Sequence, residues 1–127
     1  ILLLEEDYLK SFFGDVENVL KKDGYFLFDV NSLYGFEEIA QGSLSKEDKD
    51  KFVVLNSIFE DNKMVTKIDL FDKKLDFYNR ESGEIVQYFY KNQKLRKVSP
   101  MKFIEKVDIN LYGGEMPDKN LLIMKKR

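Results

Sequence analysis

Polar side chains gather at the end of an apolar run near the start of the chain. Asp29, Asn31 and Ser32 come where the run from Tyr25 to Val30 stops. A carboxylate, an amide and a hydroxyl placed together can orient a ligand through hydrogen bonds. In open α/β sheets, the carboxyl ends of the strands are where ligands bind. The same pattern also fits Asn31 or Ser32 as the cap of a following helix, and the residues alone leave both interpretations open.

The segment before this run predicts the element that positions it. From Glu5 to Lys22, apolar residues recur at spacings of three and four, which is typical of an amphipathic helix. Gly24 then fits a left-handed helix cap. The nearly unbroken run from Tyr25 to Val30 predicts a parallel-type strand that is covered on both faces. We therefore expect a helix-to-strand unit of an α/β sheet.

A short helix is expected over residues 32–40, with Tyr34 and Phe36 on its apolar side. These two aromatic residues could line the same site as Asn31, or they could belong to the core. Residues 41–51 are polar and rich in charge, which predicts a surface loop. The alternative for this segment is a lid over a ligand.

The hydrophobic period changes after residue 51. Four strand-like runs are separated by short polar turns, which predicts an antiparallel meander: FVVLNSIF, MVTKIDLF, LDFYN and IVQYFY, with turns EDNK, DKK and ESGE. A helix over residues 91–98 and two strands over 103–111 and 120–124 should complete the chain.

This order of elements predicts an α/β fold that looks like α+β. Residues 1–40 would be a helix–strand–helix part of the core, and residues 41–90 an inserted antiparallel sheet. Residues 91–127 would return to the core as a helix and a hairpin.

The run LKKDGYFLFDVNS resembles the fifth-strand region of class I S-adenosylmethionine-dependent methyltransferases. It is most similar to the small bacterial type that carries a β-rich substrate cap after that strand. Asp23 and Lys22 depart from the glycine and proline that are usual in the turn. The order of elements along nearly the whole chain is similar to the second half of that family. The resemblance implies a Rossmann-like sheet with an inserted substrate cap, and methyl transfer as the reaction.

A second stretch, Glu84 to Tyr90, resembles the last strand of the family's cap. Glu84, Gln87 and Tyr90 match its pattern, whereas Ile85 and Tyr88 stand where the family carries histidine and arginine. The alternative for the matching residues is ordinary strand surface with cross-strand pairing. The loss of the basic residue removes any implied preference for an anionic substrate.

The resemblance implies S-adenosylmethionine as cofactor, but its main binding motif is not found here. In the family, a glycine-rich loop after the first strand lets the backbone approach the cofactor, as in dinucleotide folds. The seven glycines of this chain never form a G-x-G-x-G arrangement. We therefore predict no cofactor-binding residue in this chain.

Composition excludes several kinds of site. The chain has no cysteine and no histidine, so thiolate nucleophiles, disulfides and histidine metal ligands are ruled out. Its acidic clusters lack the spacing of a calcium loop, and we expect no metal. The net charge of −2 gives no basic excess to favour nucleic acid. No apolar run could span a membrane and nothing resembles a signal peptide, so a cytoplasmic protein is expected.

The sequence thus predicts the substrate-capping half of a methyltransferase, acting on an unidentified nucleophile. Because the chain begins with ILLL and lacks the cofactor motif, we expect it to be a piece of a longer protein. Its partner would be the missing N-terminal half or a second copy. A non-catalytic binding or assembly module, or an unrelated α+β domain, are the alternatives. No catalytic residue is predicted; the candidate substrate-binding residues are Asp29, Asn31, Tyr34, Glu84, Gln87 and Tyr90.

Overall fold

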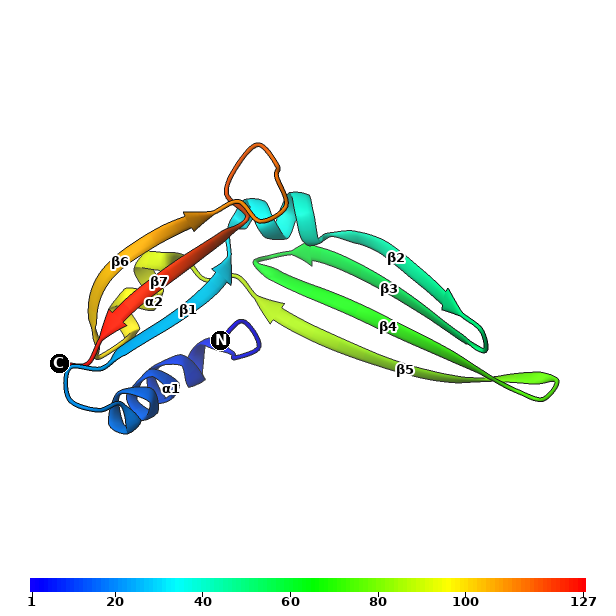
Figure 1. Ribbon diagram of the computed structural model, residues 1–127, viewed down its shortest axis with the longest axis horizontal. Coiled ribbons are helices and arrows are strands. Elements are labelled where there is room, and N and C mark those ends of the chain that lie inside the picture. The colour runs from blue at the N-terminus through cyan, green and yellow to red at the C-terminus, as the bar shows by residue number, and fades with distance from the viewer.

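The computed structural model describes residues 1–127 as two antiparallel sheets and three helical segments (Figure 1). The core sheet has the strand order β1-β7-β6, made by Tyr25–Asn31, Lys119–Lys125 and Lys102–Ile109. The cap sheet has the order β2-β3-β4-β5, made by Gly42–Asp48, Lys51–Glu60, Lys63–Lys74 and Phe77–Tyr88. The helical segments are α1 (Glu6–Val19), the π-helix η1 (Gly35–Ala40) and α2 (Asn92–Val98). The chain leaves the core sheet after β1 and returns to it through α2, which confirms the predicted α/β fold with an inserted antiparallel sheet.

Helix α1 forms because its apolar side chains share one face. Leu9 and Phe13 are fully buried on that face, against the core sheet. The predicted helix is confirmed, but it ends at Val19, three residues early. The predicted left-handed cap at Gly24 is wrong, since Asp23 carries the positive φ of 61°. Gly24 is needed for space instead, because a Cβ there would lie 2.8 Å from the carbonyl oxygen of Lys21.

Strand β1 differs from the prediction of a parallel-type strand covered on both faces. Its single partner in the chain is β7, to which it pairs antiparallel with Phe28 opposite Leu122. Tyr25 and Leu27 are each 53% exposed on the face away from the helices. The apolar run is therefore half-buried in this chain, and the other edge of β1 has no strand beside it.

The core lies between the helices and one face of the core sheet. Both α1 and α2 pack on this face, where Phe13 of α1 and Leu95 of α2 meet Leu122 and Met124 of β7. The helix and the two strands predicted for residues 91–127 are confirmed, as α2, β6 and β7. No helix of the structure is both long enough and apolar enough to cross a membrane.

The cap sheet contains four strands, but three of its boundaries differ from the prediction. The turn predicted at residues 72–74 is wrong, because β4 continues to Lys74 and the chain turns at residues 75–76. Residues 42–48 form strand β2 rather than a surface loop, and they pair with β3 although all seven are exposed. The predicted turn at 81–84 is also wrong, because β5 runs straight through it with Gly83 opposite Ile68. The predicted turn after Glu60 is confirmed: Asp61 and Asn62 both have positive φ, as in a two-residue hairpin.

The predicted short helix after β1 is confirmed as η1, and it joins the two sheets. Phe36 of η1 is fully buried and stacks on Phe59 of β3, with ring centroids 5.0 Å apart. Phe89, just after β5, meets the edge of the Phe36 ring. These contacts fix the base of the cap sheet beside the carboxyl end of β1.

Candidate functional site

The structure separates the six candidate residues into several places. At the end of β1, Lys119 donates a hydrogen bond of 3.1 Å to Oδ1 of Asn31 and lies 3.7 Å from the carboxylate of Asp29. Asn31 and Lys119 line a cavity of about 360 Å³ beneath the loop between β6 and β7. Asp29 is exposed on the opposite side of the strand from Val30, as alternation requires.

A buried carboxylate lines the same cavity. Asp118 is 1% exposed; its Oδ2 accepts a hydrogen bond from the backbone of Tyr112, and its Oδ1 has no partner. Ser32 accepts a hydrogen bond of 3.0 Å from the backbone N–H of Gly35. Of the two interpretations of the polar cluster, helix capping therefore applies to Ser32, whereas Asn31 faces the cavity.

Tyr34 does not lie with Asn31. Its hydroxyl accepts a hydrogen bond of 3.1 Å from the backbone N–H of Glu115, and its ring packs against Gly114. A Cβ on Gly114 would lie 2.5 Å from that hydroxyl oxygen. Tyr34 thus holds the loop between β6 and β7 in place through these contacts.

Glu84 and Gln87 lie on β5, three residues apart, and therefore on opposite faces of the cap sheet. Glu84 is exposed and stands opposite Lys67 of β4. Gln87 is half-buried opposite Met64. The two matching residues of this strand cannot line one site together.

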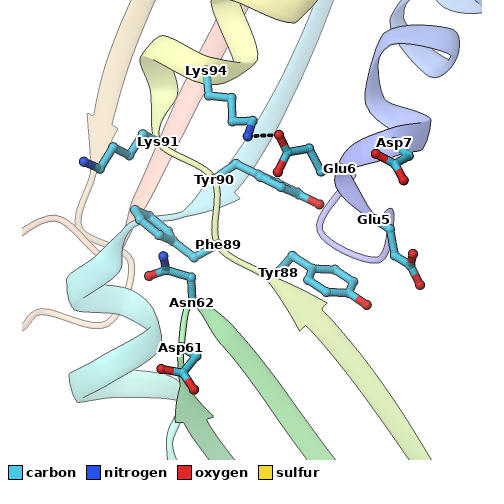
Figure 2. A pocket seen from close by; sticks show the side chains of 10 residues that line it. All are labelled: Glu5, Glu6, Asp7, Asp61, Asn62, Tyr88, Phe89, Tyr90, Lys91 and Lys94. Carbon is cyan, nitrogen blue, oxygen red and sulfur yellow. Dashed lines mark hydrogen bonds and ion pairs between the residues drawn. The ribbon is translucent and has the colours of Figure 1, made fainter.

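Tyr90 borders a hollow that we call the junction cavity (Figure 2). Its volume is about 670 Å³, and it lies where the two sheets meet. The end of β5 and the link that follows it contribute Tyr88, Phe89, Tyr90 and Lys91 to its wall, and α2 contributes Lys94. The aromatic side of the cavity is thus built by the segment that returns the chain from cap to core.

Carboxylates also line the junction cavity. Glu5, Glu6 and Asp7 come from the start of α1 on one side of it, and Asp61 comes from the turn between β3 and β4, beside Asn62, on the other side (Figure 2). The lining thus includes four carboxylates and two lysine ammonium groups. Carboxylates at the start of α1 are also stabilised by the positive end of the helix dipole.

Backbone hydrogen bonds hold these segments together. The N–H of Tyr88 donates to the carbonyl oxygen of Leu2, and the N–H of Phe89 donates to that of Asn62, each at 2.8 Å. The hydroxyl of Tyr90 donates to the carbonyl oxygen of Leu4. The residues before α1, the cap hairpin and the end of β5 are thus fixed to one another.

Burial, together with the negative charge of Glu6, raises the pKa of Tyr90 to about 12. Tyr88, Glu5 and Asp7 act in the same direction. Tyr90 is therefore a neutral hydrogen-bond donor at physiological pH. Glu6 forms an ion pair with Lys94, drawn as the dashed line in Figure 2.

Most residues of the junction cavity were not among the sequence candidates. Tyr90 is the single one of the six that borders it. Glu5 and Asp61 carry no local signal, because each is one more charged residue at a helix start or in a turn. Three segments that are distant in sequence have to meet before the cavity exists. The sequence singles out Tyr88 in one respect, because it stands where the family pattern has arginine.

Two solved structures have folds similar to that of this chain. The chain matches a S-adenosylmethionine-dependent methyltransferase from Clostridium acetobutylicum with a TM-score of 0.74 and 27% identity, over 95% of this chain and 52% of that one. It also matches an amino pentose methyltransferase from Micromonospora echinaspora, solved with S-adenosylmethionine bound. That match has a TM-score of 0.60 and 10% identity, and covers 93% of this chain and 50% of the other. No protein-family model matches, and neither does any curated protein sequence.

The chain therefore has a partial class I methyltransferase fold and spans about half the length of the solved structures it matches. The place where β1 runs into a helix does not fit the cofactor. The one glycine that follows the carboxyl end of β1 into a helix is Gly35, and its open side is filled by the carbonyl oxygen of Asp118, 2.1 Å from where a Cβ would be. No glycine cradle is left there for a ligand.

Proposed function

We propose that this chain is the C-terminal, substrate-capping half of a S-adenosylmethionine-dependent methyltransferase, which transfers a methyl group to a nucleophile. The observation that carries this proposal is the match of 95% of the chain to about half of the Clostridium enzyme, at a TM-score of 0.74. Fold alone does not define a reaction, so the proposal also relies on the common activity of both matched proteins.

In this proposal the chain divides by role. Residues 1–40 and 91–127 complete the methyltransferase core, and residues 41–90 form the substrate cap. The candidate substrate-binding residues remain Asp29, Asn31, Tyr34, Glu84, Gln87 and Tyr90, to which the walls of the junction cavity are added. S-adenosylmethionine would be held by the half of the protein that lies outside this chain. The protein would be cytoplasmic, with no metal, membrane or nucleic-acid partner.

The large exposed area of the chain supports a contact with a second half of the protein. The chain exposes 8993 Å², whereas a compact monomer of 15.0 kDa exposes about 7,000 Å². Part of the excess of about 2,000 Å² belongs to the extended cap sheet, and it is of the size that a stable interface buries. The free edge of β1, with Tyr25 and Leu27 exposed beside it, is where we place the contact with the cofactor half.

A second candidate is a non-catalytic binding or assembly module that derives from the same fold. Ile85 and Tyr88 favour it, because they replace the histidine and arginine of the family's cap strand. This candidate predicts an interaction without methyl transfer.

A transfer assay distinguishes the two candidates. The N-terminal half of the Clostridium enzyme, which the chain does not cover, is fused to the chain, and methyl transfer from labelled S-adenosylmethionine to a panel of small nucleophiles is measured. We expect turnover by the fusion and none by either half alone. In the fusion, Asn31→Ala should lower the rate at least about tenfold by loosening the site. Lys106→Ala on exposed β6 is the matched control. A folded fusion that binds the cofactor and transfers no methyl group would favour the second candidate.

A further inference from the structure

One buried side-chain polar atom of the chain has no hydrogen-bond partner, and it is Oδ1 of Asp118. Asp118 lines the cavity of about 360 Å³ at the carboxyl end of β1, which we call the strand-end cavity. Figure 1 shows that η1 and the loop between β6 and β7 lie together at this end of the core sheet. Buried polar groups are nearly always hydrogen-bonded. An unpaired carboxylate oxygen in the wall of a cavity therefore indicates a hydrogen-bond donor from outside the chain.

The fold fixes the position of this carboxylate. The N–H of Asp118 donates to the carbonyl oxygen of Ile109 at 3.0 Å, and its carbonyl oxygen accepts from the N–H of Ser32 at 2.9 Å. Gly35 packs against the same carbonyl group so closely that a Cβ there would not fit. Oδ2 accepts a hydrogen bond of 2.9 Å from the N–H of Tyr112. Oδ1 is thus held as a free acceptor at a defined place.

Asn31 contributes a free donor to the same cavity. Lys119 donates a hydrogen bond of 3.1 Å to Oδ1 of Asn31, which sets the orientation of the amide. The Nδ2 group of Asn31 donates to no other group of the chain. The lining therefore offers one acceptor and one donor. A carboxamide is complementary to both, because it carries an N–H donor beside a carbonyl acceptor.

The charges around the strand-end cavity favour a neutral ligand. The ammonium group of Lys119 lines it together with Asp118, and Asp29 lies 3.7 Å from that ammonium group. Lys119 would repel a cation, and the carboxylate of Asp118 would repel an anion. The volume lies near the lower end of the range of about 300–1,000 Å³ that is usual for small-molecule sites. The ligand is therefore small.

We propose that the strand-end cavity binds a small neutral ligand through a carboxamide group, whose N–H donates to Oδ1 of Asp118 and whose carbonyl oxygen accepts from Nδ2 of Asn31. That this ligand is the methyl acceptor rests on the proposed function. That the cavity binds a carboxamide does not.

The test is a titration of the ¹⁵N-labelled chain with three probes of similar shape, followed by amide chemical shifts. Benzamide has the donor and the acceptor, acetophenone has the acceptor alone, and benzamidine is a cation. We expect saturable shifts with benzamide at residues 31, 35, 39–40, 112 and 118–119. Acetophenone should bind at least about fivefold more weakly, because it leaves Oδ1 of Asp118 unpaired. Benzamidine should also bind more weakly than benzamide, because Lys119 repels it.

Asp118→Asn should reverse this preference. The side chain keeps its size, and its amide oxygen can still accept from the N–H of Tyr112, so an NH₂ group takes the place of Oδ1. Acetophenone should then bind more tightly than benzamide, a reversal that a loss of packing alone would not produce. Asp15→Asn, at an exposed position of α1, should leave the preference unchanged. Asn31→Leu removes the donor that both carbonyl groups use and should weaken both probes.

The spectrum of each free variant shows whether it is folded, and the comparison of the three probes on the natural chain needs no variant. Three results would overturn the proposal: no saturable shift with benzamide, which would leave Oδ1 of Asp118 to water; acetophenone or benzamidine binding as tightly as benzamide; or an unchanged preference in a folded Asp118→Asn chain.

The outcomes also separate this inference from the proposed function. Carboxamide binding without methyl transfer in the fused protein would leave the strand-end site standing and remove the enzyme. Methyl transfer by a fusion whose chain shows no preference for benzamide would keep the enzyme and remove the carboxamide site.

Discussion

The rings of Phe36 and Phe59 stack with centroids 5.0 Å apart and planes inclined by only 8°. Phe36 follows β1 of the core sheet, and Phe59 lies near the end of β3 in the cap sheet. This pair therefore joins the sheet that would carry the reaction to the sheet that would cover the substrate. It lies next to the turn at Asp61 and Asn62, which borders the junction cavity.

Removing this joint should destabilise the protein. Phe36 is fully buried, so Phe36→Ala should lower the free energy of unfolding by about 3–5 kcal/mol. Leu75→Ala, at an 87% exposed position in the turn between β4 and β5, should change it by less than about 0.5 kcal/mol. Urea denaturation followed by circular dichroism measures both. Similar values for the two variants would show that the stack does not stabilise the joint.

Gly35 and Gly14 should respond in opposite directions to alanine. A Cβ on Gly35 would lie 2.1 Å from the carbonyl oxygen of Asp118, so Gly35→Ala must displace backbone and should cost about 1–3 kcal/mol. Gly14 in α1 has nothing within 4 Å of the same atom. Gly14→Ala should therefore stabilise the helix by about 0.5–1 kcal/mol. Thermal unfolding of the two variants and of the natural chain measures the change in stability. A Gly35→Ala protein more stable than the natural chain would contradict the close packing of Gly35 on Asp118.

The carboxylate of Asp69 in the cap sheet should titrate below its usual range. Hydrogen bonds from Ser82, at 2.5 Å, and from the guanidinium of Arg80, at 2.8 and 3.1 Å, lower its pKa from the usual value of 3.8. Unfolding removes these bonds, so the unfolded chain binds this proton more tightly. The stabilisation is fully present above pH 3.8 and is lost as the pH falls through the lower pKa of the folded state.

The titration of Asp69 can be followed by the carbon resonance of its carboxyl group. Ser82→Ala should raise the pKa of Asp69 because it removes the hydrogen bond that lowers this pKa most, whereas Ser45→Ala on β2 should not. An unchanged pKa in the Ser82 variant would assign the effect to Arg80 alone.

The free edge of β1 should make the isolated chain associate. An unpaired strand edge with exposed apolar neighbours pairs readily with another chain. Sedimentation velocity should show an average mass that grows with concentration, and Leu27→Lys should suppress this growth because it places a charge beside the edge. Lys67→Ala in the cap sheet serves as the control. A monodisperse monomer at high concentration would count against this prediction.

The sequence was informative wherever a local pattern decides the structure. The helix before Leu20, the hairpin turn at Asp61 and Asn62, and the final hairpin all follow from periodicity or turn chemistry. Strand β2 could not be predicted, because all of its residues are exposed and it has no apolar alternation. The turn expected around Gly83 failed for a related reason, since pairing with Ile68 holds a glycine and its charged neighbours in a regular strand.

The candidate site was harder to predict than the fold. Asn31 was found because polar residues at a strand end are a local signal, and it does line a cavity. The junction cavity is assembled from the start of α1, a cap turn, the end of β5 and the start of α2. None of these segments signals a site alone, and Glu5, Asp7 and Asp61 line one cavity only in the folded chain.

Calorimetric titration with S-adenosylmethionine tests the central claim most directly, on the isolated chain and on its fusion to the N-terminal half of the Clostridium enzyme. The account predicts no saturable binding to the chain alone, because its glycines form no G-x-G-x-G loop, and saturable binding to the folded fusion. Tight binding of the cofactor by the isolated chain would contradict the claim that the cofactor half lies outside it. A folded fusion that fails to bind would contradict its assignment as the second half of a methyltransferase.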